Sequence, residues 1–480
     1  MLLTAKYVIP VTSPYIEDGA VLVRNDAIVE VGSAEDLKAR YPEEEVRDFG
    51  LAALSPGFVD LHTHLRYTAL RGLFEDLPYA DWRLGVYRCR PFFEGGDWDD
   101  SARLGVLEAI ASGITCVADL TSHDSALKAI SEAGLRGVIY REVTTANAAE
   151  VDERLAQAVA DIEKWSQEAD DSLVTIGLGA GSAYANHPKI YKAIADYVGD
   201  SEMPVAMHLA GSREESDFLR YGSSPFSVHA NSDDESLLNV ERPIWLPAGV
   251  SPVRYVYNWD ILKVPNMMIV HGVHVDDDDI EILRSNNVAV AHCPRINAKL
   301  GMGRAPIEKY LEAGITVGLG TDSPAAVDTT DMIDEMRVGL MIARANNEAG
   351  GKVISSDQAL RMATIDAAKA LRMDDKIGSL EAGKQADIIA IDLHNSHQNP
   401  TTNPPSAIIY TANQDNVMMT MVAGKVLYDE FTHVSGLHRD EIVQSARDIR
   451  KQIREGLNDD EIRKQVIERA KEQEKTQVKR

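Results

Sequence analysis

The sequence predicts an α/β fold, a (β/α)8 TIM barrel joined to a second β domain. Short β-branched runs alternate with helical patterns from Pro56 to about residue 370, which is typical of a parallel α/β architecture. Strand patterns return at both ends of the chain, outside this region. The barrel strands are expected near residues 57–64, 114–120, 136–143, 174–180, 204–210, 267–273, 288–294 and 316–322.

The strand patterns outside the barrel lie within residues 1–55 and again at 386–392 and 417–428. Two such sets on either side of a barrel are best explained by one composite β-sandwich domain built from both termini. The expected bounds are 1–55 with 375–435 for the composite domain, 56–374 for the barrel and 436–480 for a helical C-terminal tail. The tail is charged with helical spacing, which indicates either a solvated helix pair packed on the core or an oligomer contact.

The composition excludes two classes of partner. The 480 residues include 75 acidic and 49 basic side chains, a formal net charge of −26, whereas nucleic acids and anionic membranes call for a basic surface. Cys89, Cys116 and Cys293 show neither disulfide nor metal-ligand spacing, which fits a reducing compartment. We expect a cytoplasmic homo-oligomer that acts on a small-molecule substrate.

Five residues with metal-binding chemistry lie at the C-terminal ends of predicted barrel strands. Residues at the same end of parallel strands converge in space, however far apart they are in sequence. Imidazoles and a carboxylate are a ligand set for Zn²⁺ or a similar metal. We therefore expect one divalent metal ion, zinc in the first place, with iron, cobalt or manganese as alternatives. The five residues are His62, His64, His208, His271 and Asp322.

The pair His62 and His64 is the most specific part of this pattern. Side chains alternate along a strand, so both imidazoles face the same way. A lone histidine at a strand end is more often a capping residue. Two adjacent inward imidazoles in a strand buried on both faces need partners, and a metal supplies them. With the other three strand ends, the pattern predicts a metal-dependent hydrolase.

The connection between the fifth and sixth strands, residues 211–266, is much longer than such loops usually are. Loops at the C-terminal side of a barrel build its substrate pocket. We interpret this segment as a wall or lid of the substrate site. Its candidate side chains are Arg213, Glu214, Glu215, Phe218, Tyr221, Phe226 and His229.

The segments around the five residues form a recognisable set of motifs, which read SPGFVDLHTHL from Ser55, MHLA from Met207, VHGVHV from Val270, HCPRIN from His292 and LGTDS from Leu319. As a set they resemble the amidohydrolase superfamily, most of all its chlorotriazine hydrolase and adenosylhomocysteine deaminase branch. The segment 378–387, outside the barrel, is similar to the one that leads into that family's composite β-sandwich. The resemblance covers about residues 1–430.

The resemblance implies a mononuclear site with metal-activated water as the nucleophile. His62, His64, His208 and Asp322 would coordinate the metal, which lowers the pKa of bound water toward about 7. His271 would join the coordination, or stabilise the developing oxyanion. Asp322 would accept the proton and pass it on as general acid. No lysine occurs in 174–180, so the carbamylated-lysine bridge of dinuclear members is not available.

Other residues near the motifs are expected to contact the substrate or to orient the metal ligands. Orientation is the preferred role for the two histidines among them. These candidate substrate-binding residues are Glu214, Glu215, His274, His292 and Asn297.

Three positions depart from the family pattern. Family deaminases carry a glutamate, which shuttles a proton to the ring nitrogen of the substrate, where this chain has Gly211. Many relatives carry a histidine at Gly181 and a serine at Ile296. These departures predict a less polar and roomier pocket, although Glu214 or Glu215 could restore the proton shuttle.

The departures favour hydrolysis of a non-peptide C–N bond of the amide, urea or carbamate type. Such a carbonyl is already electrophilic, whereas a heteroaromatic amidine needs ring protonation before attack. The expected reaction is like that of the phenylurea and thiocarbamate hydrolases of the superfamily. A deaminase of an aminated heterocycle, such as an aminopurine nucleoside or a triazine, is the first alternative. A metal-binding scaffold without catalysis is the second.

Overall fold

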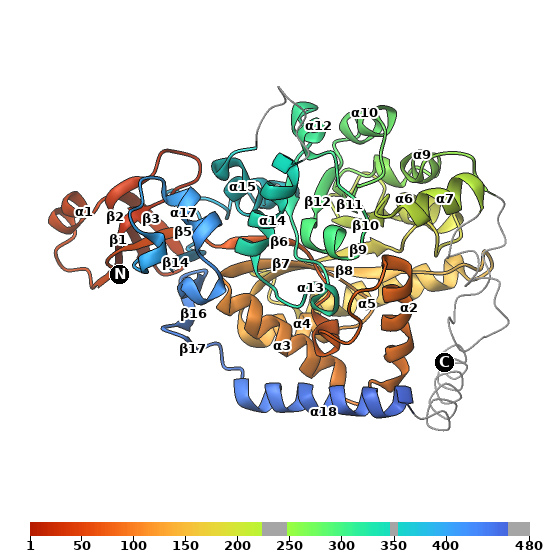
Figure 1. Ribbon diagram of the computed structural model, residues 1–480, viewed down its shortest axis with the longest axis horizontal. Helices are drawn as coiled ribbons and strands as arrows, with labels where there is room; N and C mark the ends of the chain where they lie inside the picture. The colour runs from red at the N-terminus through yellow and green to blue at the C-terminus, as the bar shows by residue number, and fades with distance from the viewer. Residues whose placement is uncertain (223–246, 346–353, 459–480) are drawn as a thin grey trace.

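The computed structural model describes residues 1–222, 247–345 and 354–458, which contain two β-sheets (Figure 1). One sheet has eight parallel strands that follow one another in chain order. All eight predicted barrel strands are present, so the predicted fold class is confirmed. They are β6 (Phe58–Thr63), β7 (Ile114–Thr121), β8 (Arg136–Val143), β9 (Val174–Ala180), β10 (Val205–Leu209), β11 (Met267–His271), β12 (Ala289–His292) and β13 (Val317–Leu319).

The two outer strands of this sheet meet where β6 passes the segment after β13. Thr63 and Asp322 form a parallel bridge between them. Asp60 strengthens the junction, since its carboxylate accepts hydrogen bonds from the backbone N–H (2.9 Å) and the hydroxyl (2.6 Å) of Thr321. The barrel therefore closes at the same edge that carries the predicted metal ligands.

Helices surround the barrel and bury apolar faces against it. In α5, Ala158, Ile162 and Trp165 recur at helical spacing and are buried, as expected for an amphipathic helix on a core. The helices are η1 (Leu65–Leu70), α2 (Tyr79–Cys89), η2 (Arg90–Phe92), α3 (Asp97–Ala111), α4 (Ser125–Ala133), α5 (Val151–Glu168), α6 (Lys189–Val198), α7 (Arg213–Tyr221), α9 (Pro252–Tyr257), η3 (Ile261–Lys263), α10 (Asp277–Ser285), α11 (Pro294–Lys299), α12 (Ile307–Glu312), α13 (Pro324–Val327), α14 (Met332–Ala345), α15 (Ser356–Met362) and α16 (Ile365–Ala370).

The second sheet combines strands from the two ends of the chain. Its central pairing joins β5 to β14 in antiparallel register, with Leu54 opposite Ala390, and Leu3, Val21 and Met419 lie in its core. The domain bounds themselves stay a prediction. The elements are β1 (Leu2–Val8), β2 (Ile16–Arg24), β3 (Ala27–Ser33), α1 (Ala34–Arg40), β4 (Val46–Asp48), β5 (Ala52–Pro56), β14 (Ile388–Asp392), η4 (Ser396–Gln398), α17 (Pro404–Thr411), η5 (Gln414–Asn416), β15 (Val417–Val422), β16 (Lys425–Asp429) and β17 (Thr432–His433).

A buried ion pair connects the sheet to the barrel. Nε of Arg136, at the start of β8, lies 2.8 Å from Oδ2 of Asp387, just before β14, and both side chains are only 2% exposed. Asp387 also accepts the backbone N–H of Ala423 at 2.8 Å. One carboxylate therefore joins two strands of the composite sheet to the barrel.

The C-terminal helix α18 (Arg439–Asn458) lies along the lower edge of the molecule beside α3 (Figure 1). Gln452 donates to the carbonyl of Phe92 at 2.8 Å, and Ile442, Ile449 and Ile453 are buried. The predicted tail is thus helical and packed on the barrel as far as residue 458. Among the described residues, no helix has the length and apolar character that a membrane crossing requires.

Candidate metal centre

The four histidines and the aspartate meet at the C-terminal end of the barrel. Nε2 of His208 lies 3.2 Å from Nε2 of His64 and 3.1 Å from Nε2 of His62. Oδ2 of Asp322 lies 3.7 Å from Nε2 of His62 and 3.6 Å from Nε2 of His271. The structure therefore brings together all five residues singled out from the sequence.

Three residues that shape this end of the barrel have left-handed backbone conformations. The φ angles are 52° at Ala210, 77° at His271 and 64° at Asp322. Non-glycine residues in this region cost on the order of 1–3 kcal/mol each, and such strain persists where the surrounding structure fixes it, often at functional sites. Ala210 follows β10, His271 ends β11 and Asp322 follows the end of β13. These turns place the side chains of His271 and Asp322 beside those of the other histidines.

The imidazoles of the centre are neutral at pH 7. Burial lowers the pKa of His64 to about 3 and that of His271 to about 4. Burial also holds the pKa values of His62 and His208 well below their usual range. Neutral imidazoles are the form that binds metal ions, so burial prepares these side chains for coordination.

The side-chain atoms at the centre fit a bound divalent metal. The Nε2 atoms of His62, His64 and His208 face one another. In each facing pair only one Nε2 can carry a hydrogen, so the other is a free lone pair that a metal can bind. Oδ2 of Asp322 is buried without a hydrogen-bond partner among the described residues, a costly state for a carboxylate oxygen. His64 is oriented by its Nδ1, which lies 2.8 Å from the carbonyl oxygen of Leu120, as is usual for a metal-bound histidine.

Two buried aspartates that the sequence analysis did not single out support the centre. Asp60 accepts the backbone N–H of His62 at 3.2 Å, and Asp119 on β7 accepts the N–H of Leu65 at 2.7 Å and the hydroxyl of Thr63 at 3.0 Å. Burial raises the pKa of Asp60 to about 7 and that of Asp119 to about 6. The sequence did contain a signal for Asp60, because it lies two residues before His62 and so faces the same side of the strand.

The three candidate residues on later segments lie at different places. Asn297 is buried on α11, with neither amide atom in a hydrogen bond of normal geometry to a described residue, and it raises the pKa of His271 against the larger effect of burial. His292 is buried at the end of β12, and burial lowers its pKa to about 3. Nε2 of His274 lies 2.6 Å from the carbonyl oxygen of Met302, so this histidine anchors a loop.

The two glycine departures do not leave open space, which corrects the expectation of a roomier pocket. A Cβ at Gly211 would lie 2.8 Å from Cδ2 of His271. A Cβ at Gly181 would lie 2.5 Å from Nδ2 of Asn186 and 2.6 Å from Oγ1 of Thr144. Neighbouring side chains therefore occupy both positions, and a larger residue at 211 would displace His271.

The two glutamates on the long connection differ in their surroundings. Glu215 is buried in the first turn of α7, and its Oε2 accepts the backbone N–H of Gly211 at 2.9 Å. Its Oε1 has no hydrogen-bond partner among the described residues. Burial raises the pKa of Glu215 to about 7, and the backbone N–H groups of Gly211 and Ala210 oppose that rise. Glu214 is half-buried.

Other predictions for the 211–266 connection have mixed outcomes. Phe218 is buried, Arg213 is exposed and Tyr221 is 67% exposed. Phe226 and His229 lie outside the described residues. The interpretation of this segment as a substrate wall therefore stays a prediction.

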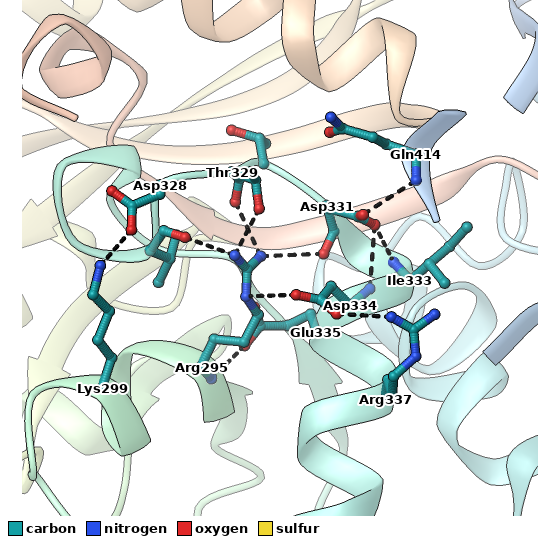
Figure 2. Close-up of polar contacts among 12 residues, drawn as sticks. Arg295, Lys299, Asp328, Thr329, Asp331, Ile333, Asp334, Glu335, Arg337 and Gln414 are labelled. Atoms are coloured by element: carbon teal, nitrogen blue, oxygen red, sulfur yellow. Dashed lines mark hydrogen bonds and ion pairs between the residues drawn. The ribbon is translucent and has the colours of Figure 1, made fainter. Parts of the chain in front are cut away.

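Arg295 fixes the loop that follows Asp322 (Figure 2). Its guanidinium donates to the carbonyls of Val327 at 2.6 Å and Thr329 at 3.0 Å. Its backbone N–H donates to Glu335 at 2.9 Å, and the Glu335 side chain is completely buried. The HCPRIN motif therefore ties α11 to α14 and holds the segment between β13 and α14.

Comparisons with known proteins agree with this geometry. Residues 53–427 match the model of the amidohydrolase family, and residues 19–43 match an imidazolonepropionase-like composite domain of bacteria. A 5-methylthioadenosine/S-adenosylhomocysteine deaminase of Symbiobacterium thermophilum is 30% identical over 429 residues, covering 88% of this chain and 92% of that protein.

Solved structures show the same fold. An adenosine deaminase from Xanthomonas campestris with bound zinc has a TM-score of 0.79 and 27% identity, over 94% of this chain and 98% of that one. A zinc complex of an atrazine chlorohydrolase from Arthrobacter aurescens has a TM-score of 0.79 and 24% identity, over 94% of this chain and 99% of that one. Both similarities extend across the barrel and the composite sheet.

Proposed function

The chain belongs to the amidohydrolase family, and from this premise we propose that it removes the amino group of an aminated heterocycle by hydrolysis. Its family places it among the hydrolases that act on carbon–nitrogen bonds, so the alternative of a non-catalytic scaffold is dropped. The deaminases among its relatives support the choice of reaction. The single structural observation that carries the choice is the buried Glu215 carboxyl beside Gly211.

The site residues would hold one divalent metal between them. The proposed ligands are His62, His64, His208 and Asp322. Two groups of side chains have ligand atoms within 4.8 Å of one another, and they share His208: one is His62, His64 and His208, the other His208, His271 and Asp322. When bound, such a metal activates water at neutral pH and polarises the electrophile.

The protein side chains then divide the proton transfers. Asp322 accepts the proton of the attacking water, because its Oδ2 faces the centre without a hydrogen-bond partner among the described residues. His271 donates a hydrogen bond to the oxygen that forms on the attacked carbon. Glu215 supplies the proton for the ring nitrogen next to that carbon, a task for which a pKa of about 7 suits a carboxyl. Asp322 then passes its proton to the departing amino group, and the hydroxyl on the attacked carbon returns a proton to Glu215. Water and the aminated substrate thus become the keto product, or its hydroxyl tautomer, and ammonia.

A second candidate is the hydrolysis of an amide, urea or carbamate. The observation in its favour is Gly211, which supplies no carboxylate at the position where family deaminases carry one. A carbonyl substrate needs no ring proton, so Asp322 alone could serve as base and then as acid. Glu215 would then act only through its hydrogen bond to the backbone of Gly211.

One screen distinguishes the two reactions. Zinc-loaded enzyme is incubated with aminopurine nucleosides, amino-triazines, anilides, phenylureas and carbamates, and the products are identified by mass spectrometry. A product that keeps its carbon skeleton and exchanges the amino group for oxygen supports deamination. A pair of fragments, an amine and an acid, contradicts it and supports the second candidate.

A variant then tests the role of Glu215 on the substrate found. Glu215→Gln is expected to lower kcat/KM for deamination by about 10²–10⁴-fold, the usual contribution of a general acid, with unchanged zinc content. Asp217→Asn, on the same helix and half-buried, is the matched control and should retain activity. Deamination by Glu215→Gln at a rate within a few-fold of the native enzyme would remove Glu215 from the mechanism.

The remaining expectations concern the state of the protein in the cell. Cys89, Cys116 and Cys293 are all buried and free, which supports the proposed cytoplasmic location. The apolar side chains of Phe431 and Val434 are 69% and 48% exposed, which supports the proposed homo-oligomer. Light scattering on the purified protein tests the second proposal, and a monomeric mass would contradict it.

A further inference from the structure

Helix α2 crosses the C-terminal mouth of the barrel. Nε1 of Trp82 donates to the carbonyl of Ala325, after β13, at 3.2 Å. The backbone N–H of Tyr79 donates to Leu300, after β12, at 3.2 Å, and its hydroxyl lies 3.0 Å from that of Tyr184, after β9. Side chains on this helix therefore lie over the end of the barrel that carries the metal centre.

Three arginines of this region form a cluster with tyrosines. Arg83 donates to the hydroxyl of Tyr87 at 2.6 Å, and its guanidinium lies 4.8 Å from the ring centre of Tyr87 and 5.0 Å from that of Tyr184. The guanidinium of Arg90, three residues after Tyr87, lies 5.0 Å from the ring centre of Tyr87. We call Arg66, Arg83, Arg90 and these aromatic neighbours the arginine–tyrosine cluster.

Arg66 connects this cluster to the metal centre. It is only 3% exposed and donates to the hydroxyls of Tyr67 at 3.1 Å and Ser122 at 2.7 Å. The ring centre of Tyr67 lies 6.1 Å from that of His64. The positive charge of Arg83 reaches the same place, since after burial it contributes to the lowered pKa of His64 and opposes the raised pKa of Asp322.

None of the three arginines forms an ion pair with a carboxylate among the described residues, although the chain has 75 acidic side chains and a net charge of −26. The neighbouring tyrosines raise the pKa values of Arg83 and Arg90, and Glu142 adds to this effect. Glu142 too forms no ion pair among the described residues. No carboxylate of the described residues therefore pairs directly with these three guanidiniums, which lie beside the proposed site for a divalent cation. A half-buried positive charge of this kind calls for an anionic partner.

We propose that Arg83 and Arg90 bind an oxyanionic group of the substrate, a carboxylate or a phosphate, while the scissile C–N bond lies at the metal centre. The inference rests on the proposed function for the reaction, and it adds the class of substrate. A guanidinium matches such a group because its planar donors meet two oxygens at once. The hydroxyl of Tyr87, already fixed by Arg83, is the neutral donor beside them.

The test measures binding, so its outcome does not depend on turnover. Isothermal titration of the zinc-loaded protein compares benzoate, phenyl phosphate and the neutral benzamide. Benzoate or phenyl phosphate is expected to bind more tightly than benzamide, and the tighter of the two identifies the anion. Arg83→Met and Arg90→Met should each weaken that binding by about 10- to 100-fold, the effect of one charge-assisted hydrogen bond, and should leave the zinc content unchanged.

Arg88→Met is the matched control, because Arg88 is exposed on the same helix, and it should bind the anion as the native protein does. Arg83→Lys keeps the charge without the planar donors and should fall between native protein and Arg83→Met. Equal affinity of native protein and both methionine variants, benzamide binding as tight as that of the anions, or no anion binding at millimolar concentration would each overturn the proposal. Anion binding without any turnover would instead count against the proposed reaction alone.

Discussion

The backbone N–H of Asp322 donates to the carbonyl of His62 at 2.7 Å. These residues lie 260 positions apart, and both are proposed ligands of the same metal. Their hydrogen bond belongs to the junction that closes the barrel between β6 and the end of β13. The centre therefore lies where the barrel closes, and the same junction brings two of its five residues together.

Asp322→Asn separates the chemistry from this junction, since the backbone bond to His62 does not involve the side chain. An amide oxygen is a poor proton acceptor, so we expect kcat of the zinc-saturated variant to fall by about 10²–10⁴-fold, while the thermal transition of the metal-free protein changes little. Steady-state kinetics and calorimetry measure the two effects. Turnover near the native rate would show that Asp322 is not the base.

Metal analysis should give one zinc per chain. Loss of an outer hydrogen-bond partner of a metal site typically lowers metal affinity by about 10–100-fold, so loss of the ligand His208 in His208→Ala should lower it further. Competition with a chromogenic chelator measures the affinity. His274→Ala is the control, because His274 contacts the carbonyl of Met302. Equal zinc affinity in both variants would contradict the assignment of His208.

The Arg136–Asp387 pair should contribute strongly to stability. Removal of one partner of a buried ion pair costs about 3–5 kcal/mol, because the remaining charge stays uncompensated. Arg136→Met is expected to lose this amount in urea unfolding, and Arg136→Met/Asp387→Leu should recover part of it. The exposed pair Arg284–Glu281, with side chains 50% and 59% exposed, is the control, and Arg284→Met should cost at most about 1 kcal/mol.

Removal of Arg295 should make stability depend on pH. Burial raises the pKa of Glu335 well above its usual range, and Arg295 opposes this. In Arg295→Met the glutamate would keep its proton at low pH, so the loss of stability should be larger at pH 8 than at pH 5, in addition to the pH-independent loss of the hydrogen bonds to Val327 and Thr329. Urea unfolding at both pH values tests this, with Lys299→Met as the control because the Lys299–Asp328 pair in Figure 2 is partly exposed.

Glu215 should add its own pH dependence in the metal-free protein. Its pKa is raised to about 7 from 4.5, so the folded state holds the proton more tightly than the unfolded state. This contribution is complete below pH 4.5 and is lost as the pH rises through 7, in total on the order of 3 kcal/mol. Relative to Glu215→Gln, the native chain should therefore become less stable between pH 5 and pH 8. A constant difference would show that the carboxyl is ionised throughout.

The sequence by itself determined the barrel, its eight strands and the five residues of the centre. Each depends on a local signal, since a run of β-branched residues indicates a strand. A side chain at the C-terminal end of a barrel strand must point toward the common mouth. His62 and His64 needed only the period of two to be placed on one face.

Only the tertiary structure decided how distant segments fill and charge the site. Nothing near Gly211 in the sequence shows that the ring of His271, sixty residues later, takes the space of a side chain there. The same holds for the pairing of Arg136 with Asp387 and for Arg83 remaining without a carboxylate among the described residues. These facts depend on which side chains meet across the fold, and packing between distant segments leaves no periodic signal in the chain.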